Sequence, residues 1–261
     1  GLNIPSVREL PEKPEILLWV GCSGAFHPRY GNVARDMARI LEAAGVSFAI
    51  PGKDELCCGD GARRLGEEAL FQNLACRNIE TLQSYGIKDI LVFCPHCYNT
   101  LKNEYPAFGG TFNVIPAVEY ILMLIDQKKI IPVYPIHKEM TLHDPCYLGR
   151  VNGIYKPLRK LVERIPGLTL KELNRSFDTA LCCGGGGGRM WLHETIGEKI
   201  NHLRAGEIME SGVDLLGTAC PFCMTMMEDG MGSVLAENEL KIMDLIEITA
   251  QSMGMEGKSK S

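Results

Sequence analysis

The stretch Asp89-Ile-Leu-Val-Phe-Cys94-Pro-His-Cys97 joins a short apolar run directly to a pair of cysteines. An apolar run of this length that ends at a turn signal is typical of a buried strand. The proline after Cys94 stiffens the turn, because its ring fixes the backbone. The Cys-x-x-Cys spacing is that of metal ligands. The sequence therefore predicts a strand that ends at a metal site.

The same arrangement occurs twice in the chain. The first five cysteines are Cys22, Cys57, Cys58, Cys94 and Cys97, and the second five are Cys146, Cys182, Cys183, Cys220 and Cys223. Equivalent positions are 124 (22 to 146), 125 (57 to 182) and 126 (94 to 220) residues apart, and only Cys76 is left over. Such a steady offset predicts an internal repeat, in which both halves of the chain have the same fold.

Each half alternates apolar runs with segments of helical periodicity. Strands are expected over 16–20, 46–50, 89–93, 139–143, 168–170 and 213–216, and helices over 33–44, 62–85, 156–165 and 190–210. This order predicts an α/β fold of two similar units, related by a pseudo-two-fold repeat, with mostly parallel sheets. The cysteine loops are expected at the carboxyl ends of the strands, where such sheets bind ligands. We expect a first repeat over 1–130, a second over 137–250 and a flexible tail over 251–261.

Composition excludes several classes of protein. The 261 residues are 46% hydrophobic and 23% charged, as in an ordinary globular protein. The net charge of −5 argues against a nucleic-acid partner, which would favour a basic surface. No signal peptide opens the chain, and no apolar run of about 18 residues is present. Because the chain begins at Gly1 rather than Met, it is compatible with a piece of a longer polypeptide whose upstream part holds a membrane segment.

The cysteines favour metal over disulfides, because five per half cannot pair within a half and no export signal is present. Zinc and a cubane 4Fe–4S cluster each use four ligands, so one thiol per half is either a spare nucleophile or a ligand of an unusual cluster. The glycine run over 184–188 lacks the Lys-Ser/Thr ending of a phosphate-binding loop. A thioredoxin-type pair would not explain the three distant cysteines of each set.

The doubled pattern Cys…Cys-Cys-Gly…Cys-Pro-x-Cys resembles the CCG-domain iron–sulfur oxidoreductases. These include the catalytic subunit of heterodisulfide reductase and the C-terminal part of membrane-associated oxidoreductases that link electron-transfer flavoprotein to quinone. The motifs that carry the second resemblance are Cys58-Gly-Asp-Gly-Ala-Arg-Arg64, His143-Asp-Pro-Cys-Tyr-Leu-Gly-Arg150 and Cys220-Pro-Phe-Cys-Met-Thr-Met226. The resemblance covers residues 15–250, but the ferredoxin-type cysteine run and the membrane domain of that branch are absent.

The resemblance implies two iron–sulfur clusters of the 4Fe–4S type, non-cubane and bound by five cysteines each. It implies an electron-transfer subunit between a flavin or ferredoxin donor and a quinone or other acceptor, with a ferredoxin-like subunit, a flavoprotein or a membrane cytochrome as partners. Location in the cytoplasm, at the inner face of the membrane, would follow from such partners. The alternatives are a disulfide reductase that splits its substrate between two clusters and a zinc-binding structural module.

Other residues near the motifs have two interpretations each. The candidates for catalysis are His143, Arg150 and Arg189, with strand capping and ordinary salt bridges as the alternatives for these and for Arg63 and Arg64. His96 is expected as an exposed spacer and Cys76 as a small buried hydrophobe. Packing roles are expected for four further side chains: Trp191, Met224, Met226 and Met227.

Overall fold

The computed structural model of the protein describes residues 4–192, 195–234 and 240–255. The chain divides into two compact units. The first consists of Gly1–Ile131 with Met255–Ser261, and the second is Pro132–Gly254. Each unit is described by itself below.

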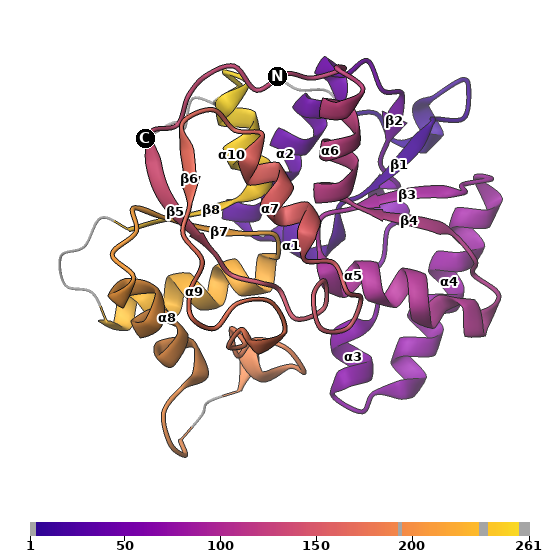
Figure 1. Ribbon diagram of the computed structural model, residues 1–261. Coiled ribbons are helices and arrows are strands. Elements are labelled where there is room, and N and C mark those ends of the chain that lie inside the picture. The colour runs from indigo at the N-terminus through magenta and orange to yellow at the C-terminus, as the bar shows by residue number, and fades with distance from the viewer. Residues whose placement is uncertain (1–3, 193–194, 235–239, 256–261) are drawn as a thin grey trace. The chain divides into compact units, whose positions relative to one another are not determined.

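The first unit is a four-stranded parallel sheet of order β2-β1-β3-β4. Its strands are β1 (Ile16–Trp19), β2 (Phe48–Ala49), β3 (Asp89–Val92) and β4 (Asn113–Pro116). Its helices are α1 (Gly21–Phe26), α2 (Pro28–Ala43), α3 (Asp60–Arg64), α4 (Glu68–Ser84), α5 (Pro95–Asn99) and α6 (Ala117–Asp126). Figure 1 draws this unit from indigo to magenta.

The second unit repeats the topology, with a parallel sheet of order β6-β5-β7-β8. Its strands are β5 (Lys138–Leu142), β6 (Leu168–Leu170), β7 (Leu215–Thr218) and β8 (Lys241–Asp244). Its helices are α7 (Lys156–Glu163), α8 (Ile200–Glu210), α9 (Pro221–Val234) and α10 (Leu245–Ser252). Helices α8 and α9 pack side by side (Figure 1).

The predicted fold class is confirmed, because both units are α/β and every strand pair is parallel. The pairing of residues between neighbouring strands is the same in the two sheets, when it is counted from the cysteines. Leu18 pairs with Leu91, three residues before Cys94, and Leu142 pairs with Gly217, three residues before Cys220. Trp19 and His143, the next residues along, are therefore equivalent positions.

Two helices are shorter than the periodicity predicts. The expected helix over 62–85 is divided into α3 and α4, because Gly66 between them has the left-handed φ of 90°. The expected helix over 190–210 begins only at Ile200, after a single 3-10 turn over Arg189–Trp191. Strands β4 and β8 and helices α6 and α10 are elements that sequence periodicity missed.

The strands that carry the sites are buried, as parallel strands covered on both faces should be. All four residues of β1 and all four of β7 are buried. Helix α10 runs to Ser252, inside the segment expected as a flexible tail, and residues 256–261 of that tail lie outside the described residues. Among the described helices, none has the length and apolar character needed to cross a bilayer.

Candidate functional site

Three loops of the first unit bring its five cysteines together. Cys22 lies in α1, two residues after the Val20 that follows β1, while Cys94 is the N-cap residue of α5 and is separated from the end of β3 by Phe93 alone. The Cys57–Cys58 pair stands in the loop between β2 and α3. Because β1, β2 and β3 are parallel neighbours, their carboxyl ends meet at one edge of the sheet.

The five thiols of the first unit form one continuous hydrogen-bonded series. Cys22 is hydrogen-bonded to Cys57, Cys57 to Cys58, and Cys58 to Cys97. Cys97 is also hydrogen-bonded to Cys94. Hydrogen bonds with Cys57 and Cys97 lower the pKa of Cys58 to about 6. The series therefore favours a thiolate at its centre at neutral pH.

The second unit reproduces the same series at the equivalent positions. Cys146 is hydrogen-bonded to Cys182, Cys182 to Cys183, and Cys183 to Cys223. Cys223 is also hydrogen-bonded to Cys220. Here hydrogen bonds with Cys146 and Cys183 lower the pKa of Cys182 to about 2. Two sequences that share the cysteine spacing thus build the same arrangement of sulfur atoms.

A glycine after each cysteine pair directs a backbone donor at sulfur. Gly59 N donates to Cys57 Sγ over 3.5 Å, and Gly184 N donates to Cys182 Sγ over 3.3 Å. Both glycines are in the left-handed region, with φ of 90° and 83°, which side chains disfavour. A Cβ at Gly59 would also lie 2.7 Å from Phe71. The turn therefore requires glycine at these two positions.

Buried polar side chains hold the first set of loops in place. Asn78 accepts a hydrogen bond from Leu56 N and donates to Cys57 O and to the Tyr105 hydroxyl group. Glu55 accepts from Val20 N and Gly21 N. Burial raises the pKa of Glu55 to about 7. Asn78 and Glu55 thus tie the two cysteine loops to α4 and to the end of β1.

An ion-pair network lies beside the first cysteines. His96, expected as an exposed spacer, is instead 4% exposed, and its Nδ1 is 2.8 Å from Asp60 Oδ2. Asp60 N in turn donates to Cys58. Arg64 binds Asp60 and Glu104, and Arg63 binds Glu104. The expectation that His96 is exposed was wrong, because Asp60 at the start of α3 supplies a buried carboxylate as its partner.

The surroundings of the second cysteines differ. His143 is 1% exposed, and one of its ring nitrogens and the sulfur atoms of Cys183 and Cys223 all lie within 4.8 Å of one another. Its Nδ1 has no hydrogen-bond partner, and burial, followed by the charge of Arg204, lowers the pKa of His143 to about 4. The imidazole is therefore neutral at pH 7. Trp19, at the equivalent position of the first unit, also has an unpaired buried ring nitrogen.

Arg204 adds a positive charge to the interior of the second unit. Its side chain is fully inaccessible, and its Nη1 donates to Glu207 and to Arg175 O. Its Nε and Nη2 have no hydrogen-bond partner. Buried donors without acceptors are rare in proteins and cost stability. Together with His143, Arg204 makes this region suited to an anionic group.

The remaining candidates have definite positions. Arg150 donates to Ala180 O over 2.7 Å, which ties the Cys146 loop to the Cys182 loop. Cys76 is exposed, contrary to expectation, because the face of α4 that holds Ala75 and Ile79 is the buried one. Trp191 is 60% exposed and meets Phe222 edge-on. Met224 and Met227 are buried in the core as expected, whereas Met226 and Arg189 line a pocket.

The donor set fits an iron–sulfur cluster. Thiolates are the soft ligands that such clusters use, and a series of five hydrogen-bonded thiols exceeds the four ligands of a structural zinc site. The unpaired N–H groups of Arg204 and the backbone N–H groups on sulfur suit a group with negative charge. The sequence missed Glu55, Asn78 and Arg204, since a single polar residue inside an amphipathic helix or loop carries no spacing signal. Asp60 lies in the Cys58–Arg64 motif, but the motif alone assigned it no role.

Comparison with known proteins agrees with this chemistry. The family described as "Cysteine-rich domain" (CCG) matches residues 16–102 and 140–228, which include all ten clustered cysteines. The chain is 42% identical over 254 residues to a probable iron-sulfur-binding oxidoreductase, FadF, of Bacillus subtilis. It is 40% identical over 257 residues to the EtfAB:quinone oxidoreductase of Syntrophomonas wolfei.

A third relative is one of the subunits of the dihydromethanophenazine:CoB–CoM heterodisulfide reductase of Methanosarcina barkeri, 31% identical over 258 residues. These alignments cover 96%, 95% and 97% of the chain, but only 36%, 36% and 62% of the relatives. The chain thus spans about a third of the first two. The relatives support an iron–sulfur redox role, and the two matched segments show that the chain belongs to the family of cysteine-rich CCG-domain proteins.

Proposed function

We propose that the chain is the electron-transfer part of a larger oxidoreductase and binds one 4Fe–4S cluster, of non-cubane type, in each unit. The proposed ligands are all five cysteines of each set: Cys22, Cys57, Cys58, Cys94 and Cys97, and Cys146, Cys182, Cys183, Cys220 and Cys223. The observation that carries this proposal is the continuous series of five thiols, which recurs in both units.

In this proposal the clusters supply one-electron redox chemistry, and the protein adjusts their charge and surroundings. Gly59 N and Gly184 N donate to ligand sulfurs, which favours the more negative, reduced state. The buried Arg204 acts in the same direction in the second unit. Buried Cys94, Cys97, Cys220 and Cys223 keep water away from one side of each site. The two units thus have the same ligands but different charges around them.

The names of the relatives support the choice of partners. A flavoprotein or ferredoxin-like donor and a quinone or other acceptor would match an EtfAB:quinone oxidoreductase. A membrane cytochrome or quinone subunit would place the complex at the cytoplasmic face of a membrane. In such a complex the present chain would pass electrons rather than bind the membrane itself.

The decisive experiment measures iron, sulfide and EPR spectra of the anaerobically reconstituted chain. We expect two 4Fe–4S clusters, with Cys57→Ala and Cys182→Ala each lowering the iron content by about half and Cys76→Ala leaving it unchanged. All five cysteines of a unit should behave alike. A cubane in either unit would be revealed by one of its five alanine variants retaining full iron, and zinc without iron would refute the redox role.

A second function, disulfide reduction, is favoured by the heterodisulfide reductase relative and by the equivalence of the two thiol series. In that function each cluster would bind one sulfur of the split disulfide and deliver one electron. Steady-state reduction of a disulfide by the reconstituted chain, with a reduced viologen dye as the electron source, tests it. No turnover above the dye-only rate would leave electron relay as the function.

A further inference from the structure

Helix α8 of the second unit and helix α4 of the first are equivalent elements. Cys220 lies 126 residues after Cys94, and the same offset relates the buried residues of the two helices. The residues Asn201, Arg204, Ala205 and Ile208 of α8 correspond to Ala75, Asn78, Ile79 and Leu82 of α4, and all eight are buried. The second unit therefore has an arginine, Arg204, where the first has an asparagine, Asn78.

In the first unit this position contacts the cysteine loop without adding a charge. Asn78 Nδ2 donates to Cys57 O and to the Tyr105 hydroxyl group, each over 3.0 Å, and Asn78 Oδ1 accepts from Leu56 N over 3.1 Å. Both ends of the amide group thus have partners. A neutral and fully bonded side chain holds the backbone of the first cysteine pair.

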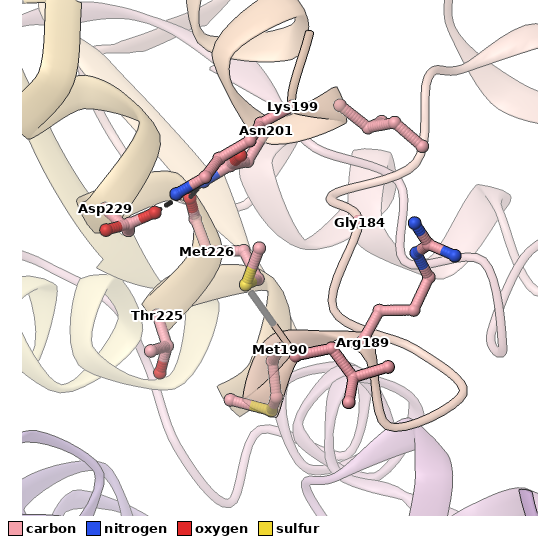
Figure 2. A pocket seen from close by; sticks show the side chains of 10 residues that line it. Gly184, Arg189, Met190, Lys199, Asn201, Thr225, Met226 and Asp229 are labelled. Atoms are coloured by element: carbon pink, nitrogen blue, oxygen red, sulfur yellow. Dashed lines mark hydrogen bonds between the residues drawn. The ribbon is translucent and has the colours of Figure 1, made fainter. Parts of the chain in front are cut away.

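In the second unit the start of α8 lies against the glycine turn that follows the cysteine pair. A Cβ on Gly184 would lie 3.4 Å from Ile200 Cβ and 3.6 Å from Asn201 N. Asn201 Nδ2 donates to Asp229 Oδ2 over 2.8 Å, which fixes this end of α8 against α9 (Figure 2). Arg204 follows Ile200 by four residues, so it lies on the same face of the helix, about 5.4 Å further along.

Arg204 brings unsatisfied donors and a charge to this region. Its Nη1 donates to Glu207 and to Arg175 O, whereas its buried Nε and Nη2 have no hydrogen-bond partner among the described residues. After burial, the charge of Arg204 is the largest of the causes that lower the pKa of His143. A ring nitrogen of His143 lies within 4.8 Å of the sulfur atoms of the buried pair Cys183 and Cys223. The charge of Arg204 therefore reaches the second cysteine set.

Neighbouring carboxylates do not cancel this charge. Glu207 is bound by Arg175 as well as by Arg204, so two guanidinium groups face one carboxylate. The buried Asp144 is bound by both terminal nitrogens of Arg159. The dipole of α10 offsets the other buried carboxylates among the described residues of this unit, which form its capping box: Asp244 and Glu247. Positive charge is therefore in excess around Glu207.

A second pair of equivalent positions differs in the same direction. Two residues before the cysteine pair, the first unit has Glu55 and the second has Ala180. The carboxyl group of Glu55 accepts hydrogen bonds from Val20 N and Gly21 N, and no Lys or Arg of the described residues binds it. Ala180 O instead accepts from the guanidinium group of the exposed Arg150 over 2.7 Å. The first unit thus has an acid, and the second a base, beside equivalent cysteines.

We propose that the second cluster has the higher reduction potential, so that the first electron given to the chain resides in the second unit. Reduction adds one negative charge to a cluster, and positive charge and N–H donors stabilise it there. Arg204 and Arg150 raise the potential of the second cluster, whereas Glu55 lowers that of the first. The proposal deepens the proposed function, since it rests on a cluster in each unit and assigns the order in which the two are reduced. In a downhill transfer the first cluster receives the electron and the second holds it for the acceptor.

The test is a redox titration of the anaerobically reconstituted 261-residue chain at pH 8, followed by EPR and visible absorption. Cys57→Ala leaves the second cluster and Cys182→Ala leaves the first, so each potential is measured alone. At the same applied potential the reduced-to-oxidised ratio of the second cluster should be about tenfold higher or more, which is about 59 mV for one electron. The half-reduced wild type should show the EPR signal of Cys57→Ala.

Charge variants test the cause. In the Cys57→Ala chain, Arg204→Gln should lower the reduced-to-oxidised ratio about tenfold, because a buried charge is weakly screened, while Arg204→Lys should stay within about threefold. Lys160→Met, on the exposed face of α7, is the matched control and should change little. In the Cys182→Ala chain, Glu55→Gln keeps an acceptor for the backbone N–H groups but loses the charge, and should raise the ratio about threefold or more.

Reduction of the first cluster before the second, or equal potentials, would overturn the proposal. Equal effects of Arg204→Gln and Lys160→Met would do the same, because the buried charge would then not be the cause. If Arg204→Gln does not retain its iron, Glu55→Gln decides, and an unchanged potential of the first cluster refutes the proposal. A chain without iron would refute the proposed function as well, whereas iron in both units with the opposite order refutes only the order of reduction.

Discussion

Arg159 binds both carboxylate oxygens of Asp144 in the interior of the second unit, with 2.9 Å between Arg159 Nη2 and Asp144 Oδ2. Asp144 stands between His143 and the Cys146 loop, and its Oδ2 also accepts a hydrogen bond from Phe177 N. The guanidinium group of Arg159 lies 3.8 Å above the Phe177 ring. This pair therefore joins the loop of Cys146 to the segment that leads to Cys182.

Replacing Arg159 should destabilise the protein strongly. In Arg159→Met the carboxylate of Asp144 stays buried without its partner, which costs about 3–5 kcal/mol of the free energy of unfolding. Urea denaturation of the metal-free chain measures it. Lys171→Met removes one member of an exposed pair with Glu139, whose side chains are 46% and 43% accessible, and should cost less than about 1 kcal/mol. Equal losses in the two variants would show that the Asp144 pair is not a structural requirement.

Glu207 should stabilise the protein only while it is ionised. Burial alone would raise its pKa, but hydrogen bonds and charge from Arg204 and Arg175 outweigh burial and lower the pKa below 4.5. A carboxyl group whose pKa is lowered on folding adds stability above its unfolded pKa, and this stability is lost as the pH falls through the folded value. Glu207→Gln should therefore lower the unfolding free energy at pH 7, by about 3 kcal/mol because Arg204 is buried.

The difference in unfolding free energy between the wild type and Glu207→Gln should shrink as the pH falls below about 4.5. Urea denaturation at a series of pH values follows it. Glu139→Gln, in the exposed pair, serves as the comparison and should show little effect at any pH. A difference for Glu207→Gln that is independent of pH would exclude the ionised form as its cause.

Removing the imidazole of His143 should stabilise the metal-free chain. Its buried Nδ1 has no partner, and an unsatisfied buried group costs about 1–3 kcal/mol, so His143→Leu should raise the unfolding free energy by about 1 kcal/mol at pH 7. Thr141→Val is the matched control, since Thr141 Oγ1, in the strand β5 that ends just before His143, is also buried and unpaired. It should give a similar gain without affecting the metal site.

The two variants should diverge once iron and sulfide are bound. Thr141→Val should keep its gain, whereas His143→Leu should lose it, because the imidazole lies beside Cys183 and Cys223 and gains a partner there. Thermal unfolding of the reconstituted proteins measures this. An identical gain in both states for His143→Leu would mean that the imidazole does not interact with the bound group.

Cysteine spacing and strand patterns were sufficient to predict most of the fold. Apolar runs that end at Cys94 and Cys220 predict β3 and β7, and the offset of 124 to 126 residues between equivalent cysteines predicts the repeated topology. Strands β4 and β8 escaped detection because each leads without a break into a helix, so no turn residue marks where the strand ends. The helix break at Gly66 was missed because helical periodicity continues on both sides of it.

The sequence by itself determined which ten cysteines form the two sets of five, because a repeated spacing can be read directly from the sequence. The parallel strands then bring the carboxyl ends that carry each set to one edge of a sheet. Only the tertiary structure decided what surrounds them. His96 is paired with Asp60, while His143 and Arg204 retain unpaired nitrogens beside the second set. Partners of this kind are distant in sequence and brought together by packing, so burial and charge around a site depend on the folded chain and leave no periodic trace in the sequence.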